Sequence, residues 1–261
     1  MLTLLKTKIG LLGLIGALCG AYLAAGNETP EKLADLTLRC DIVSYTAKDE
    51  NMLDALLALG AQEHLPMGIE YVNPKDLETP LNLKLSNATA EDVLKAILGQ
   101  HKGYEWKAQE GVLAITHKSV PMGKANLLNT LLPEFFLARR ETLQMASFSL
   151  RMQLERELYP ITERPGITGV VGSLPVGSFK NQIGPLKMHR VTVRQALDEL
   201  VRKSGEAAWV VLVPPAKLGE LPTRWPHTRV DDFWRVIEYE GKPGDWSNII
   251  TPALRANWRD P

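Results

Sequence analysis

The sequence predicts an α+β fold: two small related modules, built from βαβ units with mixed sheets, behind an N-terminal signal or anchor helix. Three observations predict it. Residues 1–26 carry a long apolar run without charges, residues 41–118 alternate between strand-like and helix-like hydrophobic periods, and part of that pattern returns 103 residues later. We therefore divide the chain into the segment 1–26, a linker at 27–40, modules at 41–118 and 119–240, and an irregular tail at 241–261.

The N-terminal segment has the layout of an export signal. Two lysines precede the charge-free run Ile9–Ala25, and small residues precede a cleavage position after Gly26. The run lies between the usual lengths of a signal peptide and a bilayer span, so a cleaved signal and a retained membrane anchor both stay open, with cleavage favoured. A lipoprotein at Cys19 is less favoured, because a leucine precedes that cysteine. We expect a periplasmic or envelope-associated protein, with residues 1–26 as the candidate membrane attachment if they are retained.

Composition narrows the class of protein. The 261 residues include 30 basic and 30 acidic side chains, and this balance argues against nucleic-acid binding, which needs a basic surplus. Apolar residues make up 45%, enough for folded domains. After cleavage only Cys40 remains, so no intramolecular disulfide is expected. We interpret Cys40 as a small packed hydrophobe rather than a reactive thiol.

The first module begins with strand and helix patterns. A leading strand is expected at Asp41–Tyr45, and leucines at helical spacing predict a helix over Asn51–Ala61, which Pro66 stops. Met67–Val72 is a short β-prone run, and Asn73-Pro74 predicts a turn.

The same module continues with a strand, a capped helix and a hairpin. Leucines alternate with polar residues over Leu81–Leu85, as in a half-buried strand. Thr89 is typical of an N-cap, and Gly99 or Gly103 is expected to end the helix. The hairpin strands are expected at Tyr104–Ala108 and Val112–Thr116.

The second module repeats the cap, the apolar helix face and a tryptophan at the offset that separates Thr89 from Thr192. The matched pairs are Thr89 and Thr192, Leu94 and Leu197, Ile97 and Leu200, Leu98 and Val201, and Trp106 and Trp209. We interpret this as a duplicated supersecondary unit. The other expected elements are a strand within Asn126–Leu137 interrupted by Pro133, a helix at Glu141–Tyr159, a long loop at Pro160–Gly184, a strand at Val210–Val213, turns at 214–231 and a closing strand at Asp232–Tyr239.

Residues 41–118 resemble the short N-terminal domain shared by secretins and TonB-dependent receptors. The resemblance rests on the helix Met52–Leu59 leading into Met67–Val72, on Leu81–Leu85 leading into Ala88–Leu98, and on the closing runs Tyr104-Glu105-Trp106 and Gly111–Ile115. It implies a small α+β module of two βαβ units in the bacterial envelope, of a kind that binds proteins or subunits and catalyses nothing. No barrel or pore region follows the match. The resemblance transfers no binding residue.

Catalytic and metal-binding patterns are not found. His64, His101, His117, His189 and His227 form no close ligand pair, and His64 and His117 are expected at solvated element ends. The Gly-rich stretch 166–184 lacks a phosphate-loop or nucleophile-elbow pattern and is interpreted as a loop. Trp106 and Trp209 are expected as core anchors. Trp225, Trp246 and Trp258 are expected to pack the tail, with an aromatic binding platform as the alternative.

The sequence therefore predicts a non-enzymatic envelope protein that acts through contacts with another envelope protein or with itself. No catalytic residue, cofactor or metal ligand is assigned, and no small-molecule ligand is expected. The alternatives are a glycan- or peptidoglycan-binding protein and, less favoured, a hydrolase with a dispersed site. The partner, the oligomeric state and any ligand of the loop 166–184 or the late tryptophans stay open.

Overall fold

Strands from both halves of the chain meet in one central sheet. The computed structural model describes residue 38 and residues 42–71, 74–123, 126–158, 182–211 and 234–239. It confirms the predicted mixed α+β class with mixed sheets and several helices. The segment 1–26, Cys40, most of the Gly-rich stretch and the tail lie outside the described residues. Within the described ranges, no helix is both long and apolar enough to cross a membrane.

The first half (residues 42–123) contains two helices of eleven or more residues between paired strands. Its elements are β1 (Ile42–Glu50), α3 (Met52–Glu63), β2 (Met67–Glu70), α4 (Pro74–Glu78), β3 (Leu81–Thr89), α5 (Ala90–Gln100), β4 (Tyr104–Gln109) and β5 (Val112–His117). β1 and β3 form an antiparallel pair, while β5 pairs antiparallel with β4 and parallel with β2.

The second half (residues 126–239) follows a related order. Its elements are η2 (Leu127–Asn129), β6 (Leu131–Leu137), β7 (Glu141–Thr142), α6 (Leu143–Leu158), β8 (Gln182–Ile183), β9 (Leu186–Thr192), α7 (Val193–Ser204), β10 (Ala207–Val211) and β11 (Trp234–Glu238). β6 pairs with β9, β7 pairs with β8, and β10 pairs with β11, each antiparallel.

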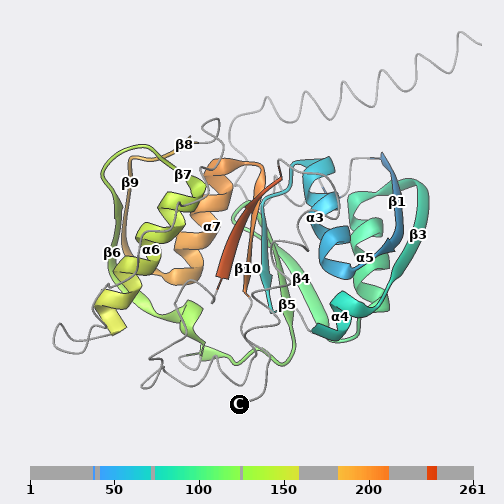
Figure 1. Cartoon of the computed structure of the whole chain (residues 1–261), viewed down its shortest axis with the longest axis horizontal. Coiled ribbons are helices and arrows are strands. Elements are labelled where there is room, and N and C mark those ends of the chain that lie inside the picture. Colours follow the sequence, from blue (N-terminus) through green and yellow to red (C-terminus); the bar gives the residue numbers. More distant parts are fainter. Residues whose placement is uncertain are drawn as a thin grey trace, which may run out of the picture.

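The elements stack in five layers. Figure 1 shows the central sheet, of order β11-β10-β2-β5-β4, with α3 and α5 on one side and α6 and α7 on the other. The pair β1–β3 covers the outer side of α3 and α5, and the pair β6–β9 covers the outer side of α6 and α7.

Two hydrophobic cores lie against opposite faces of this sheet. One gathers the apolar side chains of α3 and α5, and it includes Ala208 and Val210 of β10. The other gathers those of α6 and α7, and it includes Trp209 and Val211 of the same strand. Alternate residues of β10 therefore serve different cores, as the two-residue period of a strand requires when both faces are buried.

Local structure repeats at the 103-residue offset in more detail than the sequence pattern shows. Thr89 and Thr192 each cap a helix in a complete capping box, with Asp92 and Gln195 as the reciprocal partners. Two residues before each cap, Asn87 and Arg190 take a left-handed backbone, with φ of 55° and 50°. The pairs of apolar helix residues matched in the sequence are buried in both halves: Leu94 and Leu197, Ile97 and Leu200, Leu98 and Val201.

The outer two-stranded sheets share part of their pairing. Tyr45 is paired with Leu85 in the first half, and Phe135 is paired with Met188, the residue at the same offset, in the second. Tyr45 and Phe135 are both buried. In both β3 and β9 the left-handed residue interrupts the alternation of exposed and less exposed side chains. The register shift between Val43 and Tyr45 has no counterpart in the pairing of β6 with β9.

The structure differs from some expectations about element positions. Pro74 opens the short helix α4, because proline is favoured in a first helical turn, and the other residue of the expected Asn73-Pro74 turn lies outside the described residues. Neither Gly99 nor Gly103 ends α5; Gly99 lies inside it and His101 is its C-cap. β6 is not interrupted at Pro133, because an edge strand tolerates a missing N–H. The strand β9 is not among the expected elements.

Candidate functional site

The two halves join by direct strand pairing. β10 runs parallel to β2, with Ala208 opposite Met67, Trp209 opposite Gly68 and Val210 opposite Ile69. Because β2 also pairs with β5, it has a hydrogen-bonded neighbour on each edge. We call the β2–β10 pairing and the side chains packed around it the seam.

Two glycines let aromatic side chains of the second half lie against the backbone of the first. A Cβ at Gly68 would overlap the indole of Trp209, and a Cβ at Gly60 would overlap the phenol of Tyr239. The Tyr239 hydroxyl donates to the Leu65 carbonyl oxygen at 2.6 Å. Close approach of this kind requires glycine, so both residues are needed for the packing of the seam.

A buried ion pair crosses the seam. Glu70 of β2 is 1% exposed, and its carboxylate accepts hydrogen bonds from both terminal nitrogens of Arg194 on α7. Asn126 donates to the same carboxylate. Arg194 also donates to Asn129 at 3.3 Å. A buried carboxylate needs such partners, so this network fixes how α7 sits over β2.

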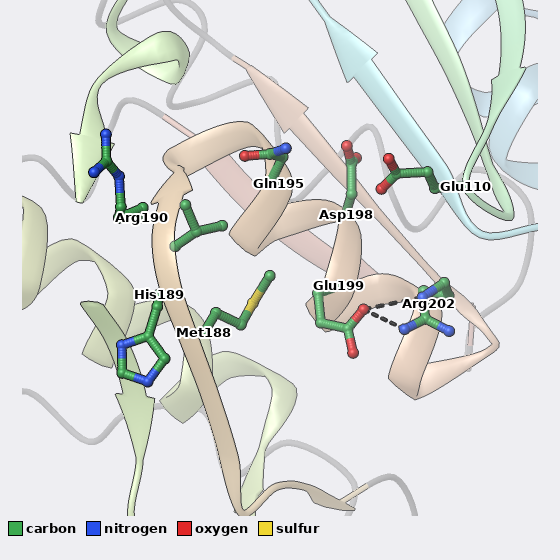
Figure 2. A pocket seen from close by; sticks show the side chains of 9 residues that line it. Glu110, Met188, His189, Arg190, Gln195, Asp198, Glu199 and Arg202 are labelled. Carbon is green, nitrogen blue, oxygen red and sulfur yellow. Dashed lines mark hydrogen bonds and ion pairs between the residues drawn. The ribbon is translucent and has the colours of Figure 1, made fainter. Parts of the chain in front are cut away.

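A pocket of about 210 Å³ lies beside the seam. It is bounded by β9, by α7 and by the turn between β4 and β5, so both halves contribute to it. Figure 2 shows Asp198 and Glu110 side by side at one end, and His189 at the other. The lining residues are Glu110, Met188, His189, Arg190, Val191, Gln195, Asp198, Glu199 and Arg202.

Asp198 has the most perturbed acidity of this pocket. Burial raises the pKa of Asp198 to about 6, and the charges of Glu110 and Glu70 add to the rise. The Trp209 indole N–H, which donates to Asp198 at 2.8 Å, and the nearby Arg194 act in the opposite direction. The pKa of Asp198 is therefore raised toward the neutral range, and its described hydrogen bond connects it to the seam.

The remaining charges of the pocket are paired or point elsewhere. Glu199 accepts from Arg202 one turn along α7. His189 lies 3.4 Å from Glu134 of β6 and is well exposed. The lining offers no serine, cysteine, threonine, lysine or tyrosine next to a base. The carboxyls of the pocket can hold a cationic group.

A second polar cluster lies at the far end of the first half. His101 is 3% exposed, and its Nδ1 lies 3.1 Å from Asp76, which also accepts from the Tyr104 hydroxyl at 2.8 Å. The rings of Tyr71 and Tyr104 contact His117 edge-on. The other nitrogen of His101, Nε2, is buried and finds no hydrogen-bond partner among the described residues.

Several residues singled out in the sequence have described positions. His64 is the C-cap of α3 and pairs with Glu206 at 2.9 Å, and His117 ends β5, so both stand at element ends as expected. Trp209 is 1% exposed, whereas Trp106 is only partly buried on the edge strand β4. The described residues contain no cluster of three or more potential metal ligands. His227, Trp225, Trp246 and Trp258 lie outside them.

Sequence patterns did not point to Glu70, Arg194 or Asp198. One signal was present, since Glu70 is a charged residue inside the apolar run 67–72, and a charge at such a position needs a buried partner. Its partner is 124 residues away, so no local spacing rule could find it. The chain matches no protein-family model, no curated protein and no solved structure.

Proposed function

We propose that the chain is a non-catalytic protein of the bacterial envelope that acts through protein–protein contacts or assembly. In this proposal the segment 1–26 exports the chain as a cleaved signal or retained anchor. Two related modules, similar to the short N-terminal domain of secretins and TonB-dependent receptors, then do the binding. The partner is another envelope protein or a second copy of the chain.

One observation carries the proposal: the two halves already associate through a sheet edge. β10 adds to β2 as a parallel strand, and the contact is completed by two aromatic side chains over glycines and by one buried ion pair. This is the way in which one folded module binds another by strand addition. Because the second half binds the first through a strand edge, the same kind of edge can serve for binding another protein.

The element order of the first half adds support. Along the chain, β1-α3-β2 and β3-α5-β4 each place a helix between two strands, which is the element order of the proposed module, although the two strands of each unit lie in different sheets. The second half has the comparable runs β6-β7-α6-β8 and β9-α7-β10. The repeated caps, left-handed residues and buried helix faces agree with duplication of one module.

The test is site-specific photo-crosslinking of the full chain in its native cells. A photoreactive residue is placed at exposed positions in turn, such as Glu105 on β4, Lys187 on β9 and Phe136 on β6. The proposal expects an envelope fraction and at least one reproducible crosslinked polypeptide, either foreign or a second copy. A cytoplasmic protein that crosslinks to nothing at any position contradicts it.

A further inference from the structure

Among the described residues β4 is an edge strand, whereas β10, the strand at the equivalent position of the second half, has a paired strand on both edges. Among the described residues β4 pairs with β5 alone, whereas β10, which stands at the same 103-residue offset, is covered on its second edge by β2. The two tryptophans differ accordingly: Trp209 is buried beside Gly68, and Trp106 is only partly buried. The first half therefore leaves open the edge that the second half uses for docking.

The free backbone groups of this edge can be identified. Lys118 N–H donates to the Gly103 carbonyl oxygen at 2.7 Å, at the end of the β4–β5 ladder. Hydrogen-bonded pairs alternate along an antiparallel ladder, so residues 105, 107 and 109 face β5 as well. The backbone groups of Trp106 and Ala108 then point away from β5, toward the open edge, where they are free to bind a further strand.

The pairing of residues in the seam indicates which side chains a strand bound to β4 must carry. In the seam, Trp209 requires a glycine opposite, flanked by apolar Met67 and Ile69 that face Ala208 and Val210. At the same offset β4 presents Trp106 between two charged side chains. The residue that matches Ala208 is Glu105, and the residue that matches Val210 is Lys107. A parallel partner strand therefore needs a basic residue opposite Glu105, glycine opposite Trp106 and an acidic residue opposite Lys107.

We propose that the open edge of β4 binds an extended strand of a partner protein, parallel to β4, through a basic-glycine-acidic triplet. This inference rests on the proposed function and names the partner's chemistry. The partner is not β2 of a second copy, because β2 has neighbours on both edges. Glu105 is 70% exposed on its side chain, and its 3.3 Å pair with Lys118 is at the surface, where it contributes little and leaves Glu105 accessible.

The probe is a capped synthetic peptide, Thr-Val-Lys-Gly-Glu-Val-Thr, titrated into the full chain by calorimetry. Two matched peptides serve as controls, one with the charges exchanged (Glu-Gly-Lys) and one with valine in place of glycine (Lys-Val-Glu). We expect the first peptide to bind. Exchange of the charges should weaken binding about tenfold, since two favourable cross-strand pairs become unfavourable. The valine peptide should not bind measurably, because its side chain meets Trp106.

The decisive arm changes the protein. E105K/K107E alters two exposed side chains, so the fold should be kept, and it should reverse the preference between the two charged peptides. Equal binding of both, no reversal in E105K/K107E, or no binding of the first peptide overturns the inference. Self-association of the chain that E105K/K107E abolishes also overturns the inference, because the occupant of β4 would then be a second copy. Crosslinked partners found only away from β4 would leave the proposed function standing while refuting this edge.

Discussion

The ion pair between Glu70 and Arg194 gives the most direct energetic prediction. Arg194→Ala removes both guanidinium hydrogen bonds and leaves the carboxylate of Glu70, 1% exposed, with Asn126 as its described partner. Breaking a buried pair by removing one partner typically costs 3–5 kcal/mol. The Arg194 side chain is 25% exposed, so water replaces part of its role, and we expect a loss of about 3 kcal/mol, at the lower end of that range.

Urea unfolding at neutral pH, followed by circular dichroism, measures this loss. With a slope of roughly 2 kcal/mol per molar urea, the midpoint should fall by about 1.5 M. Arg202→Ala is the matched control. It also removes an arginine of α7 from a glutamate, but that pair lies within one helix near the surface, so the change should stay below about 1 kcal/mol.

A double-mutant cycle separates the pair from other effects of the substitution. Glu70→Gln removes the charge that Arg194 balances, so Arg194→Ala should cost much less in the Glu70→Gln background. The reasoning is refuted if Arg194→Ala lowers the free energy of unfolding by no more than Arg202→Ala does, or if the two substitutions are additive.

Three further predictions follow from the seam and the caps. Because the folded pKa of Asp198, about 6, lies above its ordinary 3.8, ionisation of Asp198 opposes folding. The free energy of unfolding should therefore fall by about 2 kcal/mol between pH 4 and pH 6 relative to Asp198→Asn, as measured by urea titrations at each pH. Gly68→Ala should lower the free energy of unfolding by roughly 2 kcal/mol or more, because Trp209 cannot move without leaving its core; an unchanged thermal midpoint contradicts this. Thr89→Ala and Thr192→Ala should each lower the free energy of unfolding by about 1 kcal/mol in the same urea assay, because each removes a helix N-cap. If Thr192→Ala leaves the free energy of unfolding unchanged, the two caps are not equivalent.

Local patterns predicted the local structure well. The cap at Thr89, the alternation at 81–85 and the hairpin after Tyr104 all depend on residues within a few positions of one another. The same holds for the cap at Thr192, which the offset from Thr89 indicated. In each case hydrogen bonding and burial within one element decide the conformation, so spacing is sufficient.

The arrangement of the halves could not be predicted in the same way. Which edge accepts β10 depends on Gly68 lying under Trp209 and on Arg194 reaching Glu70, contacts between residues more than one hundred positions apart. Glycine inside a β-prone run and glutamate beside it were visible in the sequence. Their roles depend on where Trp209 and Arg194 lie in space, and sequence periodicity does not give those positions.

Hydrogen exchange of the full chain tests most directly whether the two halves form one body through the seam. Amides of β2 and β10 are hydrogen-bonded to each other's strand, so they should exchange with the same free energy of opening as the cores of both halves. Arg194→Ala should lower both values together. If the amides of β10 and β11 exchange freely while those of β2, β5 and α3 stay protected, the two halves open independently. The seam would then not join them into one body.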